Sequence, residues 1–271
     1  MINMHNHSHN SRDAKDSIDL ICKTAIKRNL KGIAFTDHAS VYNLDKYNVY
    51  ERIVNCKSET FKAKTDYEGK LKVLFGAEIS EAHISFERQQ EFLSIGNYDV
   101  IIASLHEAVP VESLGLDTHF RLNDFSLMPK EILIKSLKIY YNTLLEIARY
   151  ADYDILAHLT YPFRYIICRD KVNFNIDEVI EDITLILKMI ISRNKALEVN
   201  TSMANQNFFM PNRYIIELYK TLGGELITLG SDAHQANSVD QGLKEGINLL
   251  KECGFMKYYY YEKRKPISIK I

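Results

Sequence analysis

Seven short apolar runs alternate with longer stretches of helical periodicity along almost the whole chain, and this alternation restricts the fold most. Runs such as residues 100–103, Val-Ile-Ile-Ala, are apolar at every position, which is typical of strands buried on both faces of a parallel sheet. The helical stretches between them are long enough to be the crossover connections that parallel strands need. We therefore predict an α/β fold, a distorted seven-stranded (β/α)7 TIM-like barrel with one strand fewer than the usual eight.

The expected elements follow from these patterns. Strands are predicted at residues 2–5, 32–35, 73–77, 100–103, 155–157, 196–199 and 226–229. Helices are predicted at residues 17–28, 47–65, 86–93, 129–150, 176–193, from Pro211 to the Gly223-Gly224 pair, and from Ser238, as N-cap, to Cys253. Segment 107–127 lacks clear periodicity, and at this length it is expected to be a functional loop or lid. The tyrosine run 258–261 is expected to be a packed terminal segment.

Length and composition are those of one large domain. The chain has 271 residues, 46% of them hydrophobic, without a linker, a repeat or a low-complexity tract, so we expect a single domain over residues 1–271. The formal net charge of −1 argues against a dedicated nucleic-acid or membrane-surface binder. We find no apolar run that could span a bilayer, no signal peptide and no CxxC pair. These features predict a cytoplasmic protein with reduced thiols and leave the oligomeric state open.

Histidines and carboxylates gather where the predicted strands end, which is where TIM-type barrels carry their chemistry. Six of the nine histidines fall there, together with two carboxylates: His5, His7, His38, His106, His158, His234, Glu78 and Asp232. Imidazole nitrogen and carboxylate oxygen together suit zinc, manganese or iron better than calcium or magnesium. Because this set exceeds one tetrahedral site, the sequence predicts two or three metal ions.

The segment His5-Asn6-His7 closes the first predicted strand. In extended backbone, residues i and i+2 point the same way and lie about 6.6 Å apart, so both imidazoles can bind one ion from the same side. A single histidine at a strand end is more often a hydrogen-bonded structural residue, and the metal interpretation depends on the whole set. Asp13 has two interpretations, a metal ligand or a cap at the start of a helix.

Six short motifs, taken in order, resemble those of the PHP (polymerase and histidinol phosphatase) family. They are His5-Asn6-His7-Ser8 with Ser11-x-Asp13, Thr36-Asp37-His38, Gly76-Ala77-Glu78, Ser104-Leu105-His106, Ala157-His158 and Gly230-Ser231-Asp232-Ala233-His234. Their order and approximate spacing match over nearly the whole chain. Segments 197–201 and 254–266 resemble the histidinol-phosphatase branch. One departure is Asn3, where many family members carry Asp.

The resemblance implies a site with three divalent ions, zinc, manganese or iron. It assigns the ligands as follows: His5, His7, Glu78 and Asp232 to the first ion; Glu78, as a bridge, with His106 and His158 to the second; Asp13, His38 and His234 to the third. The activity that it implies is hydrolysis of a small phosphate monoester, L-histidinol phosphate, in histidine biosynthesis. The expected catalytic residues are His5, His7, Glu78, His106, Asp232 and Arg164.

Substrate recognition must come from residues beside the metals. Arg164 offers a planar fork for phosphate oxygens, although a surface arginine lying over tyrosines is an equally good interpretation. Glu81 and Glu107 follow two ligand motifs, and we expect them to bind the ammonium and imidazole groups of histidinol phosphate. His83 and Asn200 are further candidates for substrate contact, and each could instead be structural.

Three other functions compete with this one. A PHP-type phosphoesterase could act on another substrate. An amidohydrolase barrel also begins with HxH and ends with Asp, but it does not need Glu78 or His38, and the lysine that it often carries on strand four is absent from residues 100–106. A non-catalytic metal-binding module is the remaining alternative, and the apparently complete ligand set argues against it.

Overall fold

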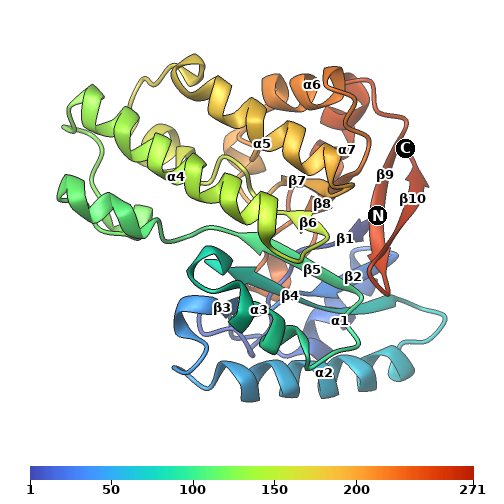
Figure 1. Cartoon of the computed structure of the whole chain (residues 1–271). Helices are drawn as coiled ribbons and strands as arrows, with labels where there is room; N and C mark the ends of the chain where they lie inside the picture. Colours follow the sequence, from blue (N-terminus) through green and yellow to red (C-terminus); the bar gives the residue numbers. More distant parts are fainter.

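The computed structural model covers residues 1–271 and describes all of them except the side chains of residues 109 and 110, which belong to the predicted loop 107–127. One sheet of parallel strands runs through the molecule in chain order (Figure 1). Its strands are β1 (Ile2–Asn3), β2 (Gly32–Phe35), β4 (Lys72–Ser80), β5 (Val100–Ser104), β6 (Ile155–Leu156), β7 (Ala196–Asn200) and β8 (Ile227–Gly230). The predicted (β/α)7 barrel is confirmed.

A short strand that we did not predict, β3 (His38–Ser40), pairs with the C-terminal half of β4. In this pairing His38 lies opposite Glu78. The pairing therefore brings two of the predicted metal ligands together through backbone register.

The barrel closes between its first and last strands through residues just beyond their ends. Met4 N donates to Leu229 O, Asp232 N to His5 O and His7 N to Ala233 O, each at 2.9 Å. These bonds set the predicted ligands His5 and His7 beside Asp232, although 225 or more residues separate them in the chain.

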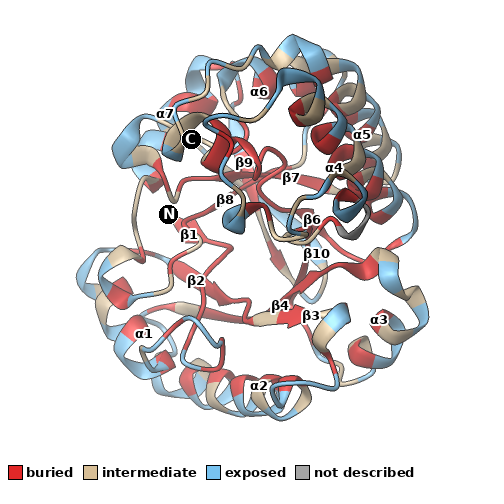
Figure 2. Cartoon of the chain, turned by 90° about the vertical axis from the view of Figure 1, so that its left-hand side faces the viewer, coloured by how far each residue is buried: buried red, intermediate tan, exposed pale blue. Residues whose placement is uncertain are grey.

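Helices surround the strands, with their exposed faces outward and their buried faces on the sheet (Figure 2). They are α1 (Ile18–Lys27), α2 (Val49–Asp66), α3 (Phe86–Leu93), α4 (Lys130–Tyr150), α5 (Ile180–Ser192), α6 (Arg213–Thr221) and α7 (Leu243–Glu252). Side chains of Ser17, Ser85 and Asn212 cap α1, α3 and α6 by accepting from backbone N–H groups of the first turn. No helix in the described part of the chain is long and apolar enough to cross a membrane.

The predicted start of the last helix is wrong. Ser238 ends a short turn, η8 (Ala236–Ser238), and α7 begins only at Leu243. The cause is Gly242, whose φ of 68° breaks the backbone direction between the two, and a Cβ there would lie 2.4 Å from Ala204 Cβ. Pro211 likewise lies outside α6, which Asn212 caps.

A C-terminal hairpin covers the N-terminal ends of the strands (Figure 1). It consists of β9 (Lys257–Glu262) and β10 (Lys265–Lys270). Tyr258, on β9, accepts a hydrogen bond from Ile2 N at 3.1 Å, and Arg264 pairs with Asp152 and Asp154, just before β6. The tyrosine run is thus a packed terminal segment, as predicted, and it leaves the opposite end of the barrel free for a site.

Candidate metal centre

Side chains that point into the barrel change character along the strands. Toward the hairpin they form an apolar cluster of Ile2, Met4, Ala34, Leu74, Val100, Ile102, Ile155, Ala157, Ala196 and Tyr261. Strand side chains alternate between faces, so the positions that follow Leu74 and Ala196 on the interior face are Gly76 then Glu78, and Glu198. The period-two pattern of β4 and β7 therefore delivers carboxylates to the barrel's interior at its C-terminal end.

Glu78 is fully buried at the centre of the predicted ligands. Its Oε2 lies 2.8 Å from His38 Nδ1, 3.4 Å from His5 Nε2 and 3.6 Å from His7 Nε2. Its Oε1 lies 3.0 Å from His158 Nε2 and 3.4 Å from His106 Nε2. Burial alone would raise the pKa of Glu78, but the imidazoles of His38, His5 and His106 outweigh it and hold this pKa well below its usual range.

Asp232 faces the other side of the HxH pair. Its Oδ1 lies 3.2 Å from His7 Nε2 and 3.7 Å from His5 Nε2. His5, His7 and Asp232 offer ligand atoms that all lie within 4.8 Å of one another, as do His38, Glu78 and His106.

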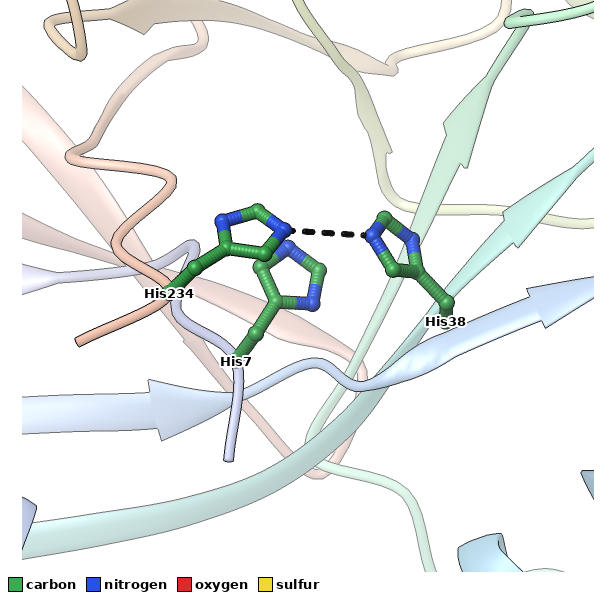
Figure 3. A group of neighbouring side chains, drawn as sticks. All are labelled: His7, His38 and His234. Atoms are coloured by element: carbon green, nitrogen blue, oxygen red, sulfur yellow. Dashed lines mark hydrogen bonds between the residues drawn. The ribbon is translucent and has the colours of Figure 1, made fainter. Parts of the chain in front are cut away.

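A third group lies nearest to solvent. His7, His38 and His234 gather their rings together, with His38 Nε2 and His234 Nε2 3.4 Å apart (Figure 3). Asp13 Oδ2 lies 3.4 Å from His234 Nε2 and 3.5 Å from His38 Nε2. Ser17 caps α1, so the structure favours the ligand interpretation of Asp13 over the helix-cap interpretation.

The hydrogen bonds around three of these imidazoles point the same nitrogen, Nε2, at the cluster. His5 Nδ1 donates to Glu198 Oε1 at 2.6 Å, because a carboxylate can only accept. His234 Nδ1 donates to the carbonyl of Asp232 at 3.0 Å. Such bonds fix the tautomer and leave the Nε2 lone pair for a metal.

His7 is also protonated on Nδ1, through a hydrogen bond to Ser11, and presents Nε2 to the cluster. Ser11 Oγ gives its proton to Asp37 Oδ1 at 2.7 Å, so it accepts from His7 Nδ1 at 3.2 Å. Asp37 also accepts from the backbone and side chain of Ser8, both at 2.7 Å. The Asp37 carboxylate therefore orients His7 without touching it.

The donor set fits divalent metal ions. His5 Nε2 and His7 Nε2 are buried within the cluster and have no hydrogen-bond partner in the structure. A buried polar atom without a partner costs about 1–3 kcal/mol, and this cost disappears if the atom is a metal ligand. Nitrogen and oxygen atoms in this mixture suit zinc, manganese or iron.

The grouping differs from the expected ligand assignment in one respect. His38 turns Nδ1 to Glu78 and Nε2 to His234, so it stands between two groups. His158 belongs to none of the three compact groups, although its Nε2 lies 3.0 Å from Glu78 Oε1. The structure thus gathers all nine predicted ligands, with Glu78 shared among them.

A cavity of about 560 Å³ opens beside the cluster. Its lining includes Asp13, His38, His106, Asp232 and His234, and also the predicted substrate residues Arg164, Glu81 and Glu107. His119, from segment 107–127, lines it as well. Metal-type ligands and candidate substrate contacts therefore share one space.

Two predicted substrate residues do not reach this cavity. Asn200 uses both amide hydrogens on Glu198 and Asp232, and its Oδ1 accepts twice from Ser202, so it has no capacity left for a ligand. His83 is absent from the cavity lining, and the charges nearest to it are those of Glu81 and Glu146. The structure therefore favours a structural role for Asn200, and the substrate contact proposed for His83 stays a prediction.

Glu81 lines the cavity, but its carboxylate accepts hydrogen bonds from backbone N–H groups and serine hydroxyls of the protein. Its Oε1 accepts from His106 N at 2.9 Å and Glu107 N at 3.3 Å, and its Oε2 accepts from Ser40 and Ser80 at 2.5 Å. These four donors occupy the carboxylate, which fixes the start of segment 107–127. The structure therefore leaves Glu107, whose carboxyl is half-buried, as the better substrate contact.

Comparison with known proteins agrees with this geometry. The profile of the PHP domain matches residues 3–202. This chain belongs to the PHP family. It is 29% identical over 263 residues to a probable histidinol-phosphatase of Clostridium acetobutylicum, covering 96% of both chains. It is 27% identical to the histidinol-phosphatase of Lactococcus lactis, covering 94% of this chain and 91% of the relative.

A solved structure is similar over the whole PHP chain. The histidinol phosphate phosphatase of Lactococcus lactis, in complex with zinc, L-histidinol and phosphate, covers 98% of each chain with a TM-score of 0.76 and 25% identity. The match to the PHP profile ends before Asp232 and His234, yet the barrel closure brings both into the cluster.

Several residues of this PHP site were not predicted, among them one carboxylate and three arginines. Glu198 orients His5, and its Oε2 accepts from His158 N at 2.8 Å. The signal was available, because a glutamate at an interior position of an otherwise apolar strand needs a partner. Arg12 lines the cavity from the segment before α1, Arg52 from the first turn of α2 and Arg121 from segment 107–127, and none of them follows a predicted strand.

Proposed function

We propose that this chain is a histidinol-phosphatase, a metal-dependent phosphomonoesterase that hydrolyses L-histidinol phosphate to L-histidinol and phosphate. The observation that carries the proposal is Glu78, whose two oxygens face five imidazoles beside a cavity that also contains Arg164. The names of the relatives and the ligands of the Lactococcus structure support the same substrate. We further propose that the chain acts in the cytoplasm as a single domain.

The donor set would hold three divalent ions. His5, His7 and Asp232 would hold one, Glu78 with His106 and His158 a second, and Asp13 with His38 and His234 a third. Zinc is present in the similar solved structure, and manganese and iron suit the same donors. When bound, the ions would supply positive charge for the phosphate oxygens and lower the pKa of water.

The protein's own groups prepare this site in three ways. Glu198, Ser11 and the Asp232 carbonyl hold the imidazole tautomers that present Nε2. Arg164 has no carboxylate within ion-pair distance in the described part of the chain, so its guanidinium is free to bind phosphate oxygens at the cavity. Glu107 offers a carboxylate for the ammonium group of the alcohol part.

The test is phosphate release from a panel of phosphate monoesters. Chelated protein would be assayed after adding back zinc, manganese or iron separately. We expect no release without metal and the highest kcat/KM for histidinol phosphate. Equal kcat/KM for histidinol phosphate and for an uncharged aryl phosphate would leave a general phosphoesterase and remove histidine biosynthesis from the proposal.

A further inference from the structure

Two arginines flank one tyrosine on the outer wall of the cavity. Arg12 Cζ lies 3.6 Å from the centre of the Tyr47 ring. Arg52 donates from Nε to Tyr47 O at 3.1 Å and from Nη1 to Asn10 O at 3.2 Å. Arg12, Arg52, Tyr47 and Asn10 all line the same cavity as the metal-type cluster. Arg12 and Arg52 therefore both contact Tyr47 and both line the cavity.

The backbone keeps this arrangement in place. Tyr47 and Asn48 have φ values of 60° and 56°, the left-handed region that residues other than glycine rarely adopt. Arg52 holds the Tyr47 carbonyl in that conformation and ties it to the loop that carries Arg12. Its Nη2 is not used by these bonds. Donors that are already held in position lose little conformational entropy when a ligand binds.

Neither guanidinium is neutralised. In the described part of the chain no carboxylate lies within ion-pair distance of Arg12 or Arg52. Five other arginines do have such a carboxylate: Arg28, Arg88, Arg169, Arg213 and Arg264. Among the residues that the structure describes, Arg12 and Arg52 therefore bring two guanidinium groups without a carboxylate partner to the lining of the cavity.

Three of the four carboxylates that line the cavity have other partners, and the fourth, Glu107, forms no ion pair with Arg12 or Arg52 in the described part of the chain. Asp13 and Asp232 face imidazoles, and Glu81 accepts from four donors. Arg164 and Arg121 already offer two guanidinium groups to the cavity. A single phosphoryl group bound at the metal-type cluster and Arg164 leaves Arg12 and Arg52 available to a second anionic group.

We propose that Arg12 and Arg52 form a second anion-binding subsite, and that the enzyme accepts phosphomonoesters whose alcohol part carries a second anionic group, a carboxylate or a phosphate. This inference rests on the proposed phosphomonoesterase function and widens its substrate class. The metal-type cluster takes the phosphoryl group that is hydrolysed, and the arginine pair binds the second anion.

The experiment compares two esters that differ in one group. 3-Phosphoglycerate carries a carboxylate where glycerol 3-phosphate carries a neutral hydroxymethyl group. The metal-loaded full chain should hydrolyse the carboxylate ester with about tenfold higher kcat/KM, because charge-assisted bonds to a partly exposed arginine pair contribute on that scale. Arg12→Gln should reduce this preference several-fold, mainly through KM, and Arg12→Lys should keep part of it.

Matched variants separate the subsite from folding effects. Arg52 also holds backbone, so Arg12→Gln/Arg52→Gln is accompanied by a thermal unfolding measurement. Arg149→Gln removes another arginine that lies over a tyrosine, with its Cζ 5.8 Å from the Tyr150 ring and outside the cavity, and it should leave the preference unchanged.

Histidinol phosphate, assayed on the same preparations, tests the proposed function separately. The enzyme has no such subsite if it hydrolyses histidinol phosphate but neither 3-phosphoglycerate nor glycerol 3-phosphate. The same conclusion follows if it hydrolyses these two esters with equal kcat/KM. A preference that survives Arg12→Gln and the double variant also overturns the proposal. An arginine-dependent preference without histidinol phosphate hydrolysis would keep the subsite and reject the proposed function, and a chain inactive on all three esters would reject both.

Discussion

Glu198 binds two predicted metal-ligand segments at once. Its Oε1 lies 2.6 Å from His5 Nδ1, and its Oε2 accepts from the backbone N–H of His158 at 2.8 Å. Burial would lower the pKa of His5, but the charges of Glu198 and Glu78 outweigh it and hold this pKa well above its usual value. One buried carboxylate on β7 thus positions ligands that follow β1 and β6.

Replacing this carboxylate should weaken metal binding while the barrel remains folded. Glu198→Gln keeps the size of the side chain but removes the charge that orients His5. Loss of such an orienting group typically lowers metal affinity by about 10–100-fold. Metal titration into chelated protein would measure it, and an unchanged affinity would make Glu198 a structural residue only.

Gly230 makes room for this contact. A Cβ at position 230 would lie 2.3 Å from Glu198 Oε1 and 2.5 Å from His5 Cβ. Gly230→Ala should therefore destabilise the fold by about 1–3 kcal/mol, as overpacking does, and also weaken metal binding. Gly32→Ala is the milder comparison, because the nearest atoms there lie 3.0–3.3 Å away and would have to move less. Denaturant unfolding compares the two, and equal effects would contradict the account.

Arg164→Ala should weaken phosphate binding without changing metal content. Loss of a charge-assisted contact costs about 1.5–3 kcal/mol. Inhibition by inorganic phosphate measures it directly, with Arg149→Ala as a matched variant outside the cavity. If phosphate inhibits the wild type and Arg164→Ala equally, Arg164 is a surface residue over its neighbouring tyrosines.

Substitutions of Glu107 and Glu81 should have different effects on substrate preference. Glu107→Gln should reduce the kcat/KM advantage of histidinol phosphate over an uncharged aryl phosphate. Glu81→Gln should affect both substrates alike, because it loosens the backbone of His106 and Glu107. Steady-state kinetics on both esters distinguishes them, and the reverse pattern would exchange their roles.

Sequence patterns predicted the side chains that lie at the ends of the strands. They did not predict the arginines that reach the cavity from between the strands. Glu78 and His106 were predictable because they follow buried strands, whose ends meet at one side of a barrel. Arg12 and Arg52 were not, because they do not follow strands and line the cavity only through tertiary contacts with Tyr47 and Asn10. His83, which the sequence offered as a substrate contact, lies two residues after Glu81 and does not line the cavity, and its role stays a prediction.

The most direct test of the whole account is the metal content of the wild type and of Glu78→Gln. Glu78 reaches His5 and His7 with one oxygen and His106 and His158 with the other. We expect close to three ions per wild-type chain by elemental analysis, and loss of about two in Glu78→Gln, since a bridging carboxylate serves two ions. A single ion per chain, unaffected by substitution of His38 or His234, would contradict the trinuclear site.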